Sequence, residues 1–243
     1  MPEAYRPDLA YIHDSGFGQP AQHAAQELLT ALRRQGLSGG LVIDLGCGSG
    51  ILSQVMADAG YAVLGIDLST AMVEMARQRV PRGEFRVGSF VEMEWPPCVA
   101  VAAVGEIFNY LFDDRNTRQT MGKVLRRIHS ALVPGGVLIF DVAGPGRVPG
   151  RGPRQKYVTG DGWTVLVTAE EDQQRQTLTR QITSFRRVGD LYRRDEELHR
   201  LRLYRPAEVA RQLRQIGFRV KPLAAYTGWR FPQGWRGFLA RTP

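Results

Sequence analysis

A carboxylate and three glycines follow one another closely near residue 45. Asp44 lies inside the apolar run Leu41–Leu45, and the next five residues, Gly46–Gly50, have glycine at their first, third and fifth positions. The apolar run predicts a short buried strand. Glycines at every second position permit a tight turn in which the backbone faces a ligand. A helix is expected next, over Ile51–Ala59. The order of elements predicts a nucleotide-type site at the carboxyl edge of a parallel sheet.

Three positions indicate which nucleotide-type ligand fits. The dinucleotide fingerprint needs a small residue where this chain has Ile51, so a nicotinamide oxidoreductase is disfavoured. Asp44 would repel a pyrophosphate, but it suits a ligand that has an ammonium and a sulfonium near the turn. A second strand, Tyr61–Asp67, ends in an acid 17 residues after Gly50. A carboxylate there can accept both ribose hydroxyls. S-adenosylmethionine (SAM) has an ammonium, a sulfonium and a ribose and lacks a pyrophosphate, so it fits all three positions.

The chain resembles the class I SAM-dependent methyltransferases in three pieces. They are Val42–Gly50, Gly65–Ser69 and Leu132–Gly136, which together span roughly residues 40 to 142. The resemblance implies an α/β fold, with a doubly wound, mostly parallel sheet of seven strands and SAM as the cofactor. It also implies a set of cofactor-binding residues near the carboxyl ends of the first four strands: Asp44, Gly46, Cys47, Gly48, Ser49, Gly50, Asp67, Leu68, Met72, Ser89, Phe90, Gly105 and Glu106.

Members of this set have different expected roles. Asp44 and the glycine turn would hold the methionyl end of SAM, and Asp67 would hold its ribose. The family commonly has an acid after the glycine that leaves the third strand, and that acid accepts the adenine amine. Ser89 stands there in this chain, so its hydroxyl or the backbone would have to make the contact. Phe90 either lines the adenine slot or packs in the core as an ordinary aromatic residue.

Four residues are candidates for contact with the methyl acceptor. Glu106 and Tyr110 leave the fourth strand, where related small-molecule methyltransferases have an acid or a serine followed by Asn-Tyr-Leu. Tyr11 and His13 lie in the segment Tyr11–Gly18, which we expect to be a hinged lid rather than a core element, because it contains glycines and lacks periodicity. The imidazole of His13 could take a proton from the acceptor.

The remaining elements position this edge of the sheet. Helices are expected to open at Pro20 and Pro206 and after Ser69, and one more is expected to start at Asp113 or Asp114. We expect three regions. Residues 1–38 would form an N-terminal lid segment and helix, and residues 39–144 with 206–243 would form the SAM-binding Rossmann-like core. Residues 145–205 would form an antiparallel insertion over the site. The insertion is expected to have three strands, at about 157–170, 175–188 and 191–204, after a loop at 144–156. Two last strands, near 218–226 and 237–240, would flank a loop at 229–235.

Composition bounds the remaining possibilities. The chain has 243 residues, 43% of them apolar, which suits one domain with a real core. No apolar run approaches the ~18 residues of a membrane span, and no secretory signal is evident, so we expect a cytoplasmic protein without a membrane partner. Cys47 and Cys98 offer neither a disulfide framework nor metal spacing. The chain is expected to be a monomer or a homodimer.

Charge is distributed unevenly. The formal net charge is +8, and residues 145–243 hold 20 Lys and Arg against 9 Asp and Glu. A basic half can indicate an acidic substrate or a nucleic acid, although exposed arginines are often simply solvated. We therefore expect a SAM-dependent methyltransferase acting on an N or O atom of a small molecule. An RNA methyltransferase that uses the basic half and a non-catalytic SAM-binding protein remain the alternatives.

Overall fold

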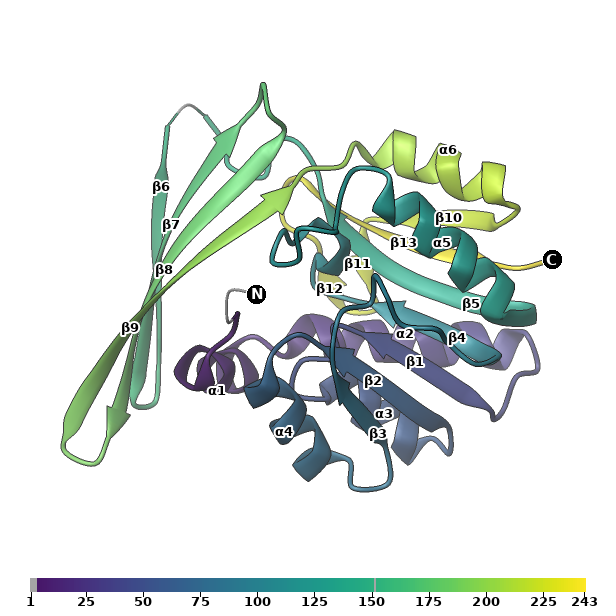
Figure 1. The fold of residues 1–243 in the computed structure, drawn as a ribbon, viewed down its shortest axis with the longest axis horizontal. Helices are drawn as coiled ribbons and strands as arrows, with labels where there is room; N and C mark the ends of the chain where they lie inside the picture. The colour runs from purple at the N-terminus through teal and green to yellow at the C-terminus, as the bar shows by residue number, and fades with distance from the viewer. Residues whose placement is uncertain (1–3, 151) are drawn as a thin grey trace.

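A seven-stranded sheet forms the centre of the molecule in the computed structural model, which describes residues 4–150 and 152–243 (Figure 1). In spatial order the strands are β10 (Arg219–Leu223), β13 (Trp235–Arg241), β5 (Leu132–Ala143), β4 (Cys98–Ala103), β1 (Leu41–Leu45), β2 (Ala62–Asp67) and β3 (Glu84–Val87). β13 runs antiparallel to the other six strands of this sheet, which are parallel to one another. The strand order reverses between β1 and β4, and ligands of such sheets bind at that reversal. The predicted fold class is confirmed.

Helices cover both faces of this sheet. One face packs against α2 (Gln19–Arg34), α3 (Ile51–Asp58) and α4 (Thr70–Arg79), and the other against α5 (Thr120–Ala131) and α6 (Pro206–Ile216). Neighbouring residues of β1 face opposite layers, Val42 toward the first and Ile43 toward the second, and both are fully buried. A strand buried on both faces explains why its sequence is apolar almost throughout. A short 3₁₀ turn, η1 (Ile107–Asn109), follows β4.

Three of the expected helix starts, at Pro20, after Ser69 and at Pro206, agree with the structure, and one does not. Pro20 lies in the first turn of α2, and the Ser69 hydroxyl caps α4 by accepting from the Met72 amide at 3.2 Å. The helix expected from Asp113 or Asp114 begins only at Thr120. Asp113 instead closes a turn, since its carboxylate accepts from the Arg115 amide at 3.0 Å.

The insertion is a separate antiparallel sheet of four strands. They are β6 (Arg154–Gly160), β7 (Trp163–Asp172), β8 (Thr177–Val188) and β9 (Leu191–Arg202), in that spatial order. The prediction of three strands was wrong. The expected segment 157–170 contains a turn at Asp161–Gly162, where Gly162 has φ +72°, and the strand before it begins inside the expected loop. This sheet extends to one side of the central sheet (Figure 1).

The N-terminal segment is helical, contrary to the expectation of a glycine-broken lid. Helix α1 (Pro7–Gly16) lies between the insertion and the core (Figure 1). Pro7 suits the first helical turn, where no amide hydrogen is needed. Leu9 and Ile12 bury one face of the helix against the insertion, where they form one apolar cluster with Trp163 and Ile182. A single helical turn of apolar spacing was too short a signal to predict the element from sequence.

The chain ends with an additional hairpin before the last strand. Strands β11 (Ala225–Tyr226) and β12 (Trp229–Arg230) pair in antiparallel fashion, so the loop expected at 229–235 begins two residues later. The fully buried Tyr226 donates its hydroxyl to Asp141 of β5 at 2.7 Å. Within the described residues, no helix has the length and apolarity that crossing a bilayer requires.

Candidate active site

The turn between β1 and α3 is built from backbone in the left-handed region. Gly46, Gly48 and Gly50 have φ of +64°, +52° and +80°. A Cβ on Gly46 would lie 2.4 Å from Ile107 Cδ1, so the turn also needs glycine for space. The amide of Gly46 donates to the Ile66 carbonyl of β2 at 2.7 Å. The turn is therefore fixed to the neighbouring strand.

Asp67 organises the end of β2. One carboxylate oxygen accepts from the Gly48 amide at 2.9 Å, and the other accepts from the Ser69 amide at 2.8 Å. Each oxygen keeps a lone pair for a further donor. Burial raises the pKa of Asp67, although the amide bonds oppose that shift. The residue lines the pocket and presents acceptor atoms that suit a pair of ribose hydroxyls.

Asp44 is buried in β1 and does not line the pocket. Its carboxylate accepts from the Ser53 hydroxyl of α3 at 2.8 Å. Burial raises the pKa of Asp44 to about 7, the bond from Ser53 lowers it, and the nearby Asp67 raises it further. A carboxylate with such a pKa responds strongly to a neighbouring cation, because the cation favours the ionised form.

The pocket lies where the strand order reverses, and it is small. Its volume is about 110 Å³, below the ~300–1,000 Å³ that is typical of ligand pockets. Ala4, Tyr5 and His13 of the N-terminal segment form part of its wall. The rest of the wall includes residues that the sequence predicted, namely Gly46, Gly48, Asp67, Leu68, Met72, Phe90, Gly105 and Tyr110. It also includes residues that the sequence did not indicate as site residues, namely Ile66, Gly88, Val104, Ile107, Phe112, Asp113 and Asn116.

Other expected cofactor residues lie around the pocket without lining it, namely Asp44, Cys47, Ser49, Gly50, Ser89 and Glu106. The Ser49 hydroxyl donates to Asp14 of α1 at 2.5 Å, and Arg79 of α4 pairs with the same carboxylate at 2.8 Å. The Ser89 hydroxyl accepts from the Val91 amide at 3.1 Å. The contacts of Ser49 and Arg79 with Asp14 hold the glycine turn and α1 together, whereas Ser89 closes a turn after β3.

Tyr5, Tyr110 and His13 form the aromatic side of the pocket. The hydroxyls of Tyr5 and Tyr110 lie 2.9 Å apart, and the rings of Tyr5 and His13 meet edge to face at 5.2 Å. Burial lowers the pKa of His13 to about 4, the nearby Asp14 raises it, and His199 lowers it again. His13 is therefore a neutral imidazole at pH 7. Tyr5 was missed because nothing in the sequence around it forms a pattern.

Glu106 and Tyr11 do not lie where the sequence suggested. The carboxylate of Glu106 accepts from Arg147 at 2.8 Å and from Arg180 at 2.7 Å. Burial alone would raise the pKa of Glu106, but the two guanidinium groups outweigh it and lower the pKa, so the carboxylate is a poor proton acceptor. Tyr11 is 38% exposed and packs under the Arg186 guanidinium, 3.7 Å from the ring centre. The structure thus assigns Glu106 to joining the insertion to the core.

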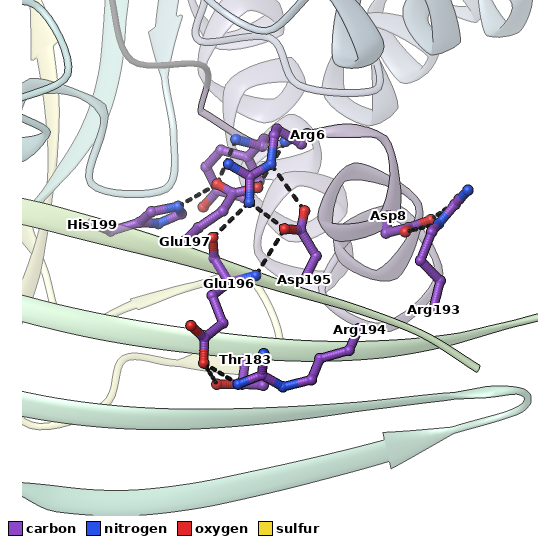
Figure 2. A network of polar contacts seen from close by, with 10 residues as sticks. Arg6, Asp8, Thr183, Arg193, Arg194, Asp195, Glu196, Glu197 and His199 are labelled. Atoms are coloured by element: carbon purple, nitrogen blue, oxygen red, sulfur yellow. Dashed lines mark hydrogen bonds and ion pairs between the residues drawn. The ribbon is translucent and has the colours of Figure 1, made fainter.

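The insertion holds the N-terminal wall of the pocket through a polar network (Figure 2). The carboxylate of Glu197 accepts from the amides of Tyr5 and Arg6, both at 2.8 Å, and from His199 Nε2 at 2.8 Å. It therefore caps the start of α1, where unpaired amides favour an anion. Asp8 in the first turn of α1 pairs with arginines of β8 and β9, and Arg6 pairs with Asp195.

Comparisons with known proteins agree with this geometry. Residues 42–136 match the family described as "Methyltransferase domain". A putative methyltransferase of Geobacillus sp. (strain WCH70) is 26% identical over 230 residues, covering 89% of this chain and 90% of the relative. A solved SAM-dependent methyltransferase from Clostridium acetobutylicum superposes with a TM-score of 0.80 at 16% identity, over 96% of this chain and 97% of that one. SAM-bound CalS10 of Micromonospora echinaspora, an amino pentose methyltransferase, superposes with a TM-score of 0.76 at 19% identity over the full length of both chains.

Proposed function

We propose that this chain transfers the methyl group of SAM to an N or O atom of a small molecule. The methyltransferase domain matched at residues 42–136 identifies the chain as a class I SAM-dependent methyltransferase. The enzyme class and the cofactor SAM are shown by that domain and by the SAM-bound proteins of the same fold. The observation that supports the acceptor class is the likeness over the whole chain, α1 and the insertion included, to the fold of solved small-molecule methyltransferases such as the amino pentose methyltransferase CalS10, with a TM-score of 0.76.

The residues present fit SAM. The glycine turn leaves space that a Cβ would fill, and Asp67 keeps free acceptor lone pairs at the pocket wall. We assign Asp67 to the ribose hydroxyls and the turn at Gly46 and Gly48 to the methionyl end. The buried Asp44 would favour the positive charges of that end. Phe90 would contact the adenine ring, because its side chain lines the same pocket.

When bound, SAM would supply a methyl group on a sulfonium, which is activated for in-line transfer. The chain then has to position the acceptor at ~3–3.5 Å from the methyl carbon and to exclude water. We assign the orientation of the acceptor to Tyr5 and Tyr110, whose hydroxyls lie 2.9 Å apart at the pocket wall. His13 is neutral at pH 7 and can accept the proton that the acceptor loses, although its low pKa makes it a weak base.

The insertion argues against the RNA alternative for this site. Its arginines near the pocket are largely occupied by carboxylates: Arg147 and Arg180 by Glu106, and Arg186 and Arg193 by Asp8. Paired guanidinium groups contribute little to a phosphate-binding surface, because each would have to give up its present partner. The excess positive charge of residues 145–243 is therefore weak support for a nucleic-acid acceptor.

Product analysis tests the proposal. The protein is incubated with methyl-deuterated SAM and a cell extract divided into small-molecule and RNA fractions, and mass spectrometry locates the label. We expect label in one small molecule, lost with Asp67→Ala and retained with Asp58→Ala, which alters an exposed acid on α3. Label found in RNA alone would refute the assignment of a small-molecule acceptor. Tight SAM binding without label in either fraction would favour a binding protein.

A further inference from the structure

A second concave site lies between α2 and the edge strands β10 and β13. This groove has a volume of about 390 Å³, which is within the ~300–1,000 Å³ range of small-molecule sites. It lies beside the edge strand β10, whereas the cofactor pocket lies around the ends of β1, β2 and β4, and the two sites share no lining residue. Asp67 of the cofactor pocket ends β2 at the carboxyl edge. The groove is therefore separate from the site of methyl transfer.

Four cations and one acid line the groove. The cations are Arg34 on α2, Arg219 and Lys221 on β10 and Arg241 on β13, and the acid is Glu27 on α2. Glu27 already accepts from the Thr227 hydroxyl at 2.6 Å and lies 3.9 Å from Lys221. Most of the positive charge in the groove is therefore not neutralised by its own lining. A concave surface of one sign concentrates counter-charged ligands.

The three arginines of the groove have no partner within the described residues. Neither an ion pair nor a side-chain hydrogen bond is made by Arg34, Arg219 or Arg241 anywhere in residues 4–150 and 152–243. The arginines near the pocket differ, since Arg147 and Arg180 both pair with Glu106. Guanidinium groups that are unpaired around one hollow can bind an anionic ligand without giving up a present partner.

The floor of the groove is apolar. Ala31 of α2, Val220 of β10 and Leu239 of β13 contribute to the lining between the charged side chains. Inorganic anions gain nothing from such a floor, whereas an organic body can bury apolar surface on it. Arginine is suited to phosphate, because its planar guanidinium binds two oxygens at once.

We propose that this groove binds an organic phosphate that carries two or more negative charges. The unpaired arginines bind the phosphate oxygens, and the apolar floor receives the organic part of the ligand. Adenosine triphosphate (ATP) is a suitable probe of this chemistry, and inorganic pyrophosphate is the probe without an organic part.

Calorimetry tests the groove with the cofactor pocket blocked. The intact chain is titrated at low salt with ATP and with pyrophosphate, both in saturating S-adenosylhomocysteine so that adenosine cannot enter the methyl-transfer site. We expect ATP to bind at least fivefold more tightly than pyrophosphate. The double variant Arg34→Gln/Arg219→Gln should weaken ATP binding at least tenfold, while Arg33→Gln, an exposed neighbour on α2 outside the groove, should stay within twofold.

Several outcomes would overturn the proposal. The proposal is wrong if ATP does not bind at millimolar concentration, or if pyrophosphate binds as tightly as ATP. It is also wrong if ATP binding weakens equally in the double variant and in the control. Binding of a single-stranded RNA without binding of ATP would assign the groove to nucleic acid instead. Retained S-adenosylhomocysteine binding in the double variant shows that it is folded, and Lys221→Gln offers a second, milder variant that should weaken ATP binding about threefold.

Discussion

The affinity for SAM should rise with pH between 5.5 and 7, because Asp44 has to ionise when the cationic end of SAM binds. Burial raises the pKa of this carboxyl to about 7 in the free protein. Below that pH, Asp44 is mostly protonated before binding. The ammonium and sulfonium of SAM favour the carboxylate and lower its pKa, so binding at low pH must release a proton. Proton release makes binding weaker as the pH falls.

The size of the effect follows from the ionised fraction. With a pKa of about 7, Asp44 is ionised in about 3% of free molecules at pH 5.5 and in about half at pH 7. The SAM association constant should therefore rise about fifteenfold over this interval. Measurements above pH ~7.5 are less informative, because an α-amino group loses its own proton near there.

Isothermal titration calorimetry in paired buffers measures both the affinity and the number of protons released. We expect release of nearly one proton at pH 5.5 and about half a proton at pH 7. In Asp44→Asn the association constant should be lower at pH 7 and nearly independent of pH. If the SAM association constant of the unmodified protein does not change with pH, the proposed role of Asp44 is refuted. If the association constant of the variant depends on pH as it does in the unmodified protein, the released proton comes from another group, such as Asp141, whose pKa burial raises to about 6.

Two further predictions concern the wall and the turn of the pocket. Glu197→Gln should lower the free energy of unfolding by about 2 kcal/mol in urea denaturation, since it leaves one buried donor at the start of α1 without an acceptor. The control Glu196→Gln alters an exposed neighbour and should lower this free energy by less than ~0.5 kcal/mol. Equal losses in the two variants would contradict the capping role of Glu197. Gly46→Ala should weaken SAM binding at least tenfold in calorimetry, because its Cβ would lie 2.4 Å from Ile107 at φ +64°. Gly39→Ala, with nothing within 4 Å, should bind SAM normally, and unchanged binding in both variants would contradict the role of the turn.

Elements with strong local signals were predictable from the sequence. The buried strand β1, its glycine turn and the acid that ends β2 each have a physical cause within a few neighbouring residues. Apolar side chains on both faces make a central strand, and positive φ strongly favours glycine. The seven-strand fold follows from those pieces through the resemblance, and the comparisons support the same fold and cofactor.

Long-range contacts decide the features that the sequence did not show. Helix α1 exists because Leu9 and Ile12 find an apolar surface on the insertion, more than 150 residues away. Glu197 has no local motif, yet it caps that helix by accepting from the Tyr5 and Arg6 amides. No spacing rule connects residues so distant in one sequence.

The same limit applies to the acceptor side of the site. Glu106 was a reasonable candidate because it leaves a central strand at the ligand edge. Its partners Arg147 and Arg180 come from the loop after β5 and from β8, and they turn its carboxylate into an ion-pair centre. Tyr110 does line the pocket, where its partner is the hydroxyl of Tyr5. The role of each candidate residue stays a prediction until substituted proteins are assayed.

A crystal structure of the protein with S-adenosylhomocysteine tests the central claim most directly. The account predicts both ribose hydroxyls within about 3 Å of the Asp67 carboxylate oxygens. The amino-acid part should lie along the turn at Gly46 and Gly48, and the sulfur should face the side of the pocket formed by Tyr110 and His13. Ribose bound away from Asp67, or a pocket left empty at millimolar ligand, would contradict the assignment of this site.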